Sequence, residues 1–164
     1  MSDTAWIGAA LTAARPQAVA ALLRYFRTLD TAEEAFQNAC LRALKSWPEK
    51  GPPRDPAAWL IMVGRNAALD QVRRDAKSAP LPDEAAISDL GDAEADIAER
   101  LDGGQYRDDI LRLLFICCPP DLPATQQIAL ALRIVSGLSV KQIARAFLVS
   151  EAAMEQRITR AKAR

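Results

Sequence analysis

Residues 139–164 read SVKQIARAFLVSEAAMEQRITRAKAR, and this stretch predicts the fold of the C-terminal part of the chain. Ser139 and Ser150 each stand directly before a segment of apolar periodicity, the place of a helix N-cap. Between the two segments, residues 148–150 form a short turn, and small Ala144 suits a close helix crossing. The stretch therefore predicts a helix-turn-helix, with helices at 139–147 and 151–164. An amphipathic hairpin with a solvated basic face is the alternative.

The outward face of the second helix carries side chains that can read DNA bases. Gln156 can pair two-pronged with an adenine edge, and arginine can do the same with guanine. Small residues allow a close approach to the groove, and the other cations suit phosphates. Glu155 flanks this face. The predicted DNA-contacting residues are Lys141, Ala152, Gln156, Arg157, Thr159 and Arg160.

Composition favours helices throughout the chain. Half of the 164 residues are hydrophobic, only 5% are aromatic, and alanine and leucine are abundant. Nothing spans a membrane, because no run of about 18 apolar residues occurs. The N-terminus does not resemble a secretory signal. We expect a cytoplasmic, all-α protein.

Histidine is absent, and the three cysteines lack metal-site spacing. The adjacent pair Cys117 and Cys118 is most simply a pair of small hydrophobes at a helix end, with redox sensing as the alternative. Without histidine the commonest general base is missing. We therefore expect no metal, no cofactor and no enzymatic activity.

Charge divides the chain into three segments although the net charge is zero. Residues 1–79 carry a net +3, residues 80–109 carry −8, and residues 110–164 carry +5. The acidic segment has prolines, glycines and few large apolar residues, which is typical of a linker, with one short helix around 92–101. We predict two small helical domains, an N-terminal helical bundle at 1–78 and a C-terminal helix-turn-helix domain at 106–164, joined by an acidic flexible linker at 79–105.

The remaining helices are predicted from periodicity and end signals. In the first domain, Thr31 and Glu34 suggest a capping box, and Asp55-Pro56 suggests a helix start. The stretch WPEKGPPRDP should be a loop. Gly137 is a helix stop. The predicted helices are at 4–14, 16–28, 31–46, 56–77, 106–117 and 124–135.

The helix from Pro56 has an apolar arc and, opposite it, a polar stripe. The arc includes Ile61, Met62 and Leu69. A solvated face, with Asp70 paired to a nearby arginine, is one interpretation of the stripe. Arg65 falls among the apolar positions and should snorkel or bond a carbonyl. The stripe consists of Asn66, Asp70, Arg73, Arg74 and Lys77.

Three motifs resemble a known family. The motifs are AEEAFQNACLRAL, AWLIMVGRNAALDQVRR and LSVKQIARAF. Together they resemble extracytoplasmic-function (group four) bacterial sigma factors, over about residues 18–78 and 108–164. The segment DDILRLLFICCPPDLP most resembles the subgroup that carries a long helical extension after the second domain, so we expect the chain to be a shortened form of a longer protein.

The resemblance implies roles for the predicted residues. The stripe from Asn66 to Lys77 would face the downstream promoter element, and loop 48–55 would capture a base flipped from it. The last helix would read the upstream element. Asn38, Cys40 and Pro119 depart from the family pattern. Residues implied in docking on the polymerase clamp are Glu33, Glu34, Gln37 and Arg42.

We therefore expect a sigma factor that binds core RNA polymerase and two promoter elements and aids duplex opening. The resemblance also implies control by an anti-sigma factor or by an intramolecular C-terminal extension. The alternatives are a helix-turn-helix repressor or activator that acts without polymerase, and a helical adaptor that does not bind DNA. An enzyme is disfavoured.

Overall fold

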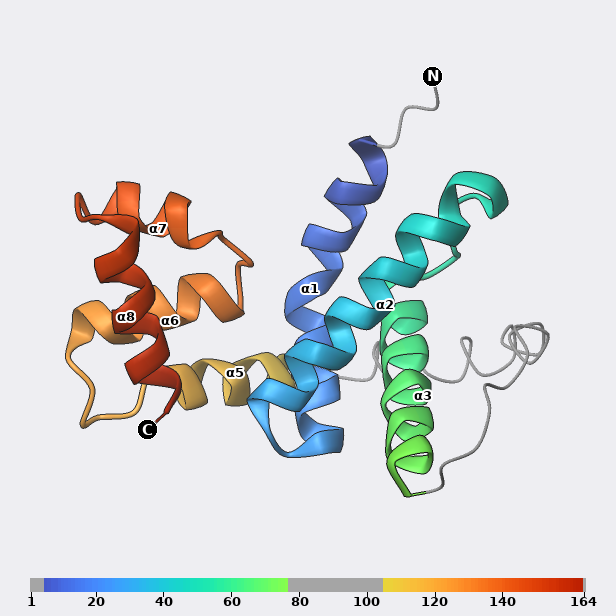
Figure 1. Cartoon of the computed structure of the whole chain (residues 1–164), viewed down its shortest axis with the longest axis horizontal. Helices are drawn as coiled ribbons and strands as arrows, with labels where there is room; N and C mark the ends of the chain where they lie inside the picture. The colour runs from blue at the N-terminus through green and yellow to red at the C-terminus, as the bar shows by residue number, and fades with distance from the viewer. Residues whose placement is uncertain (1–4, 77–104, 164) are drawn as a thin grey trace. The chain divides into compact units, whose positions relative to one another are not determined.

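The computed structural model describes the backbone of residues 5–76 and 105–163 and the side chains of residues 5–70 and 108–163. Within these ranges all regular structure is helical, which confirms the all-α prediction (Figure 1). The chain divides into two units, Met1–Asp109 and Ile110–Arg164. The predicted linker and its short helix lie outside the described residues, apart from position 105. The helices are α1 Ala5–Phe26, α2 Leu29–Lys50, α3 Pro56–Ala76, α5 Gln105–Cys117, α6 Ala124–Ile134, α7 Val140–Ala146 and α8 Glu151–Lys162.

Helix α1 is one continuous helix, so the prediction of two helices broken near residue 15 was wrong. Pro16 lies inside it. An internal proline removes a backbone hydrogen bond and costs about 3 kcal/mol. Buried residues such as Ile7 and Leu22 lie on both sides of the proline. Each such side chain contributes roughly 1.5–3 kcal/mol when buried, so their combined burial offsets the cost of the proline.

Helix α2 is longer at both ends than predicted. It begins at Leu29, and its N-cap Thr28 makes no side-chain cap hydrogen bond. The capping box of Thr31 and Glu34 was therefore wrong; the Thr28 hydroxyl instead donates to the Thr31 hydroxyl at 2.6 Å. At the other end α2 continues through Pro48 to Lys50, because its last turn carries Trp47, which is buried in the bundle.

Helix α3 begins where the sequence predicted. The Asp55 carboxylate accepts a hydrogen bond from the backbone N–H of Ala58 at 3.0 Å, which confirms the N-cap. The buried arc of α3 is wider than predicted and includes Leu60 and Val63. At Gly64 the helices approach so closely that an added Cβ would lie 2.9 Å from the Ala35 carbonyl oxygen. Helices α1, α2 and α3 pack against one another as a three-helix bundle (Figure 1).

The helices from α5 to α8 follow the predicted helix bounds within one or two residues. Helices α6, α7 and α8 pack together, around Ile134, Ile143 and Met154, which are fully buried. Gly137 has φ +68°, the left-handed conformation expected of a glycine after a helix end. Cys117 is fully buried, in agreement with its prediction as a small hydrophobic residue near a helix end.

Candidate nucleic-acid interface

Helices α7 and α8 form the predicted helix-turn-helix. The Ser139 hydroxyl accepts from the backbone N–H of Gln142 at 3.2 Å, and the Gln142 side-chain oxygen accepts from the backbone N–H of Ser139 at 2.8 Å. This reciprocal capping box starts α7. The Ser150 hydroxyl accepts from the backbone N–H of Ala153 at 3.3 Å and starts α8. Short-range hydrogen bonds thus fix where both helices begin.

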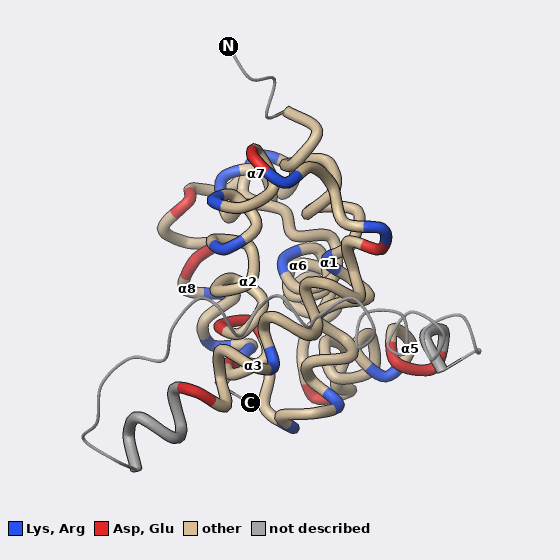
Figure 2. The backbone as a smooth tube through the Cα atoms, turned by 90° about the vertical axis from the view of Figure 1, so that its right-hand side faces the viewer, with Lys and Arg blue, Asp and Glu red and all other residues tan. Residues whose placement is uncertain are grey.

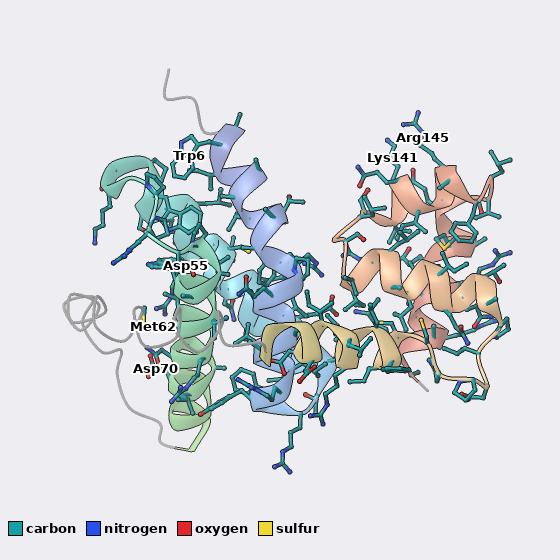
Figure 3. All side chains as sticks on the ribbon, turned by 180° about the vertical axis from the view of Figure 1, so that it is seen from behind. Trp6, Asp55, Met62, Asp70, Lys141 and Arg145 are labelled. Carbon is teal, nitrogen blue, oxygen red and sulfur yellow. The ribbon has the colours of Figure 1, made fainter. Side chains whose placement is uncertain are left out.

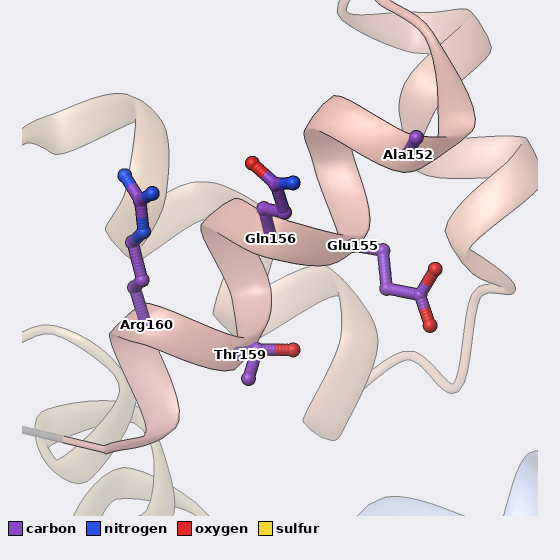
Figure 4. Close-up of a pocket in the computed structure, with 5 residues that line it drawn as sticks. All are labelled: Ala152, Glu155, Gln156, Thr159 and Arg160. Atoms are coloured by element: carbon purple, nitrogen blue, oxygen red, sulfur yellow. The ribbon is translucent and has the colours of Figure 1, made fainter.

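The two faces of α8 differ in character. Met154, Ile158 and Ala161 are buried, as predicted. The opposite face is exposed and forms a shallow, open hollow. Figure 4 shows the polar side chains extending from this face, away from the helix axis. The residues that line the hollow are Ala152, Glu155, Gln156, Thr159 and Arg160.

The outward face of α8 is accessible to a ligand in the folded protein. All the residues on α8 predicted to contact DNA are exposed, and Arg157 lies beside the hollow. A helix of this width fits the major groove of DNA, where amide and guanidinium groups can reach base edges. Glu155 adds an acceptor, which suits the amino group of cytosine.

Helix α7 supplies two more cations. Lys141 and Arg145 are exposed one turn apart on this helix (Figure 3). Figure 2 marks the basic residues of α7 and α8 in blue. The sequence interpretation included Lys141 and missed Arg145, although the spacing of four residues places both on one helical face. Exposed cations beside a recognition helix suit backbone phosphates.

On α3 the structure tests only part of the predicted polar stripe. Asn66 is exposed. Asp70, which Figure 3 labels on α3, is half-buried. Arg73 and Arg74 lie on α3, but their side chains are outside the described set, as is the whole of Lys77. Arg65 is exposed and has no carbonyl partner among the residues that the structure describes. Its guanidinium lies 4.8 Å from the centre of the Tyr25 ring.

On α2 one predicted docking residue is buried and the other three are exposed. Glu33 is only 7% exposed, and its carboxylate pairs with the Arg15 guanidinium of α1 at 3.2 Å. The burial of Glu33 does not suit a direct contact with a partner, and its carboxylate helps to hold α1 against α2. Its role in polymerase binding stays a prediction. Glu34, Gln37 and Arg42 are exposed, as expected.

Two apolar side chains on α2 were missed. Leu41 is 58% exposed and Leu44 is 50% exposed. Spacings of three and four residues place them on one face with Glu34 and Gln37. This spacing could have identified them, but an apolar residue on a helix is usually interpreted as core. We call Glu34, Gln37, Leu41 and Leu44 the α2 outer face.

Cys40 lies at the side of α2 and is half-buried. Burial raises the pKa of its thiol to about 11, and the nearby Arg15 lowers it by a smaller amount. The thiol is therefore protonated and unreactive at neutral pH. Among the described residues no group of three or more histidine, cysteine or acidic side chains could hold a metal ion.

Comparison with known families identifies the chain. Residues 11–78 match sigma-70 region 2, and residues 113–164 match sigma-70 region 4. These two regions correspond to the α1–α3 bundle and to the helix-turn-helix unit. The chain therefore belongs to the sigma-70 family, in its extracytoplasmic-function form.

The chain is also similar to an uncharacterized protein of Rhizobium meliloti (strain 1021). The two are 74% identical over 164 residues, which cover the whole of this chain and 39% of that protein. The chain thus spans well under half the length of this curated relative. No solved structure matches this chain. None of the helices in the described part is both long and apolar enough to cross a bilayer.

Proposed function

We propose that the chain gives bacterial RNA polymerase its promoter specificity. It binds the core enzyme, holds two promoter elements and helps to open the duplex at the downstream element. The observation that carries this proposal is the exposed polar face of α8 in a helix-turn-helix, in a chain that also matches sigma-70 region 2. A sigma factor needs both parts, because the helix-turn-helix unit alone would bind DNA without the polymerase contact that we assign to α2.

The upstream element is read by α8 from the major groove. Gln156 and Arg160 contact base edges, while Lys141, Arg145 and Arg157 contact phosphates. Each good base contact contributes roughly 1–3 kcal/mol of discrimination. Because phosphate contacts release counterions, affinity falls steeply as salt rises.

The downstream element is held by α3 and by the loop before it. Asn66 and Asp70 are the described members of the polar stripe, and both lie at least partly at the surface. We assign Arg73, Arg74 and Lys77 to the same contact. The loop Gly51–Asp55 captures a base that leaves the stack, which recovers part of the unstacking energy.

The α2 outer face binds the core polymerase. Its exposed leucines provide an apolar centre, and polar groups such as Glu34 surround it. Apolar centres with polar rims are typical of protein interfaces. Arg42 lies at the edge of this face. The Glu33 carboxylate contributes only indirectly, because it fixes the position of α1 against α2.

Control of the chain is also part of the proposal. Either an anti-sigma factor or a helical extension of the same polypeptide holds the sigma factor inactive, as in the subgroup that the sequence most resembles. The site of action is the cytoplasm, where polymerase and chromosome meet. The protein itself performs no covalent chemistry.

In vitro transcription tests the proposal. Core polymerase of Rhizobium meliloti, genomic fragments of the same organism and this chain should together yield transcripts that start at a defined set of promoters. Transcripts that do not depend on the chain would contradict the proposal. Footprinting with and without core polymerase separates it from a repressor, which would protect a palindrome on its own.

Matched variants test the reading by α8. Gln156→Ala should weaken discrimination at one upstream base pair by roughly 5- to 150-fold, the equivalent of one lost base contact. Arg112→Ala removes an exposed cation from α5 and serves as the control, with upstream recognition unchanged. Equal effects of the two substitutions would exclude α8 as the reading helix.

A further inference from the structure

We propose that Trp6 and Trp47 are positioning residues for the loop Gly51–Asp55, and that Arg54 is the side chain that this loop presents to the downstream element. The inference rests on the proposed function. It adds residues to the downstream contact that the sequence interpretation did not include.

All three tryptophans of the chain gather at one end of the bundle. The rings of Trp6 and Trp47 are stacked, with centroids 5.9 Å apart and planes at 9°. The rings of Trp47 and Trp59 meet edge to face, with centroids 5.3 Å apart. The cluster therefore joins α1, α2 and α3 through side chains, with Trp47 at its centre. Figure 3 labels Trp6 on α1 and Asp55 at the start of α3.

Both ends of the loop are attached to this cluster. The backbone N–H of Gly51 donates to the Trp47 carbonyl at 2.9 Å. The backbone N–H of Trp59 donates to the Asp55 carbonyl at 3.0 Å. A shift of either ring therefore moves one end of the loop, because ring and backbone belong to the same residue.

The loop is short and stiff between these attachments. Its sequence is GPPRD, and its two prolines have fixed φ. Gly51 has φ +80°, which side chains rarely tolerate. A loop that is ordered before binding loses less conformational entropy when it captures a base. The stack of Trp6 on Trp47 thus preserves a preformed binding shape.

Arg54 is the side chain best suited to contact the nucleic acid from this loop. It is exposed, and apart from Asp55 it is the only charged residue in the loop. The Asp55 carboxylate is already used as the cap of α3. A guanidinium can form paired hydrogen bonds with a guanine edge or a phosphate.

The centre of the cluster retains an unsatisfied polar group. The indole Nε1 of Trp47 is buried and has no hydrogen-bond partner in the described part of the chain. Such a donor is unfavourable, so the large ring is there for its packing rather than for its N–H. Phenylalanine keeps an aromatic ring and removes the donor, which makes Trp47→Phe a suitable conservative variant.

The test compares holoenzymes on a promoter recovered from the genomic pool and on single-base variants of its downstream element. The quantity measured is the ratio of affinities for the original and the altered element. Arg54→Ala and Trp6→Ala should each lower this ratio by roughly 5- to 150-fold, the scale of one lost base contact. Trp6→Phe, which keeps an aromatic ring, should leave this ratio close to that of the original protein. In the double variant Trp6→Ala/Arg54→Ala the two effects should not multiply, because Trp6 acts through the loop.

Three controls separate positioning from stability. Affinity for core polymerase and discrimination at the upstream element should stay unchanged. Near-ultraviolet circular dichroism of the free chain, whose three tryptophans all lie in this cluster, should change when the stack is lost. If Trp6→Ala unfolds the bundle, the pair Trp47→Phe and Trp47→Leu replaces it, and only the aromatic variant should keep the discrimination ratio.

Two results would overturn the inference. One is a Trp6→Ala holoenzyme whose downstream discrimination stays within twofold of the original protein although the stack is lost. The other is full multiplication of the Trp6 and Arg54 effects. A wild-type holoenzyme that transcribes without any downstream discrimination would instead contradict the proposed role of the loop itself.

Discussion

The helix-turn-helix and the three-helix bundle specify their helix ends in different ways. In the helix-turn-helix, the hydroxyls of Ser139 and Ser150 bond to backbone groups three residues away. In the bundle the Asp55 carboxylate caps α3 in the same way, but Pro16 and Pro48 lie inside helices that continue because both ends pack on distant residues. Local hydrogen bonds are visible in a sequence, whereas packing between helices is not. This difference predicts which substitutions each unit should tolerate.

The largest effect is expected when the ion pair of the bundle is broken. Glu33→Ala removes the carboxylate that lies 3.2 Å from the largely buried Arg15 guanidinium. Loss of one partner of a buried pair costs about 3 kcal/mol of unfolding free energy. Glu34→Ala, at the exposed neighbouring position, should stay within roughly 0.5 kcal/mol. Tryptophan fluorescence during denaturation measures the unfolding free energy of the bundle, since all three tryptophans lie in it. Equal costs would mean that the pair does not hold α1 against α2.

A close helix contact provides the next test. Gly64→Ala places a Cβ 2.9 Å from the Ala35 carbonyl oxygen, and such overpacking costs about 1–3 kcal/mol. Gly8→Ala is the matched control, because nothing lies within 4 Å of its added Cβ. This control should stabilise helix α1 by roughly 0.5–1 kcal/mol. Thermal denaturation should show a lower melting temperature for Gly64→Ala and a higher one for Gly8→Ala. A stabilising Gly64→Ala would contradict the close approach of α2 and α3.

Removal of a cap should affect the helix-turn-helix alone. Ser139→Ala deletes the hydroxyl that accepts from the Gln142 N–H and should cost about 1 kcal/mol. Ser136→Ala changes an exposed serine just before α7 that caps no helix, and should have little effect. Amide hydrogen exchange in peptides from residues 110–164 should reveal the faster opening, while peptides of the bundle stay unchanged. Faster exchange in both units would show that the cap is not a local feature.

The smallest effects concern two residues in the same strained conformation, one in each unit. Arg27 has φ +64° after α1, and Leu148 has φ +53° in the helix-turn-helix turn. Because glycine adopts this conformation without steric cost, Arg27→Gly and Leu148→Gly should each stabilise their unit by roughly 0.5–1 kcal/mol. Leu148 is 92% exposed, so little packing is lost. Destabilisation by Leu148→Gly would indicate that the leucine side chain itself is needed. Hydrogen exchange measures both units in one experiment.

Much of the candidate interface could be predicted from the sequence. The outward face of α8 follows directly from the positions of Met154 and Ile158, since helical geometry places Gln156 and Arg160 opposite them. Arg145 could have been found by the same rule. Glu33 could not, because its partner Arg15 lies on another helix and no local pattern identifies that pair. The tryptophan cluster was likewise invisible, since its rings are 12 and 41 residues apart along the chain.

The sequence by itself determined the all-helical class, the separation into two helical modules and the helix-turn-helix with its caps. The physical reason is that caps, turns and apolar stripes depend on residues within about one or two helical turns. Only the tertiary structure decided that α1 continues through Pro16, that Glu33 is buried and that Trp47 joins three helices at the loop. These features depend on contacts between helices, whose burial energy exceeds the local preferences of proline and glutamate.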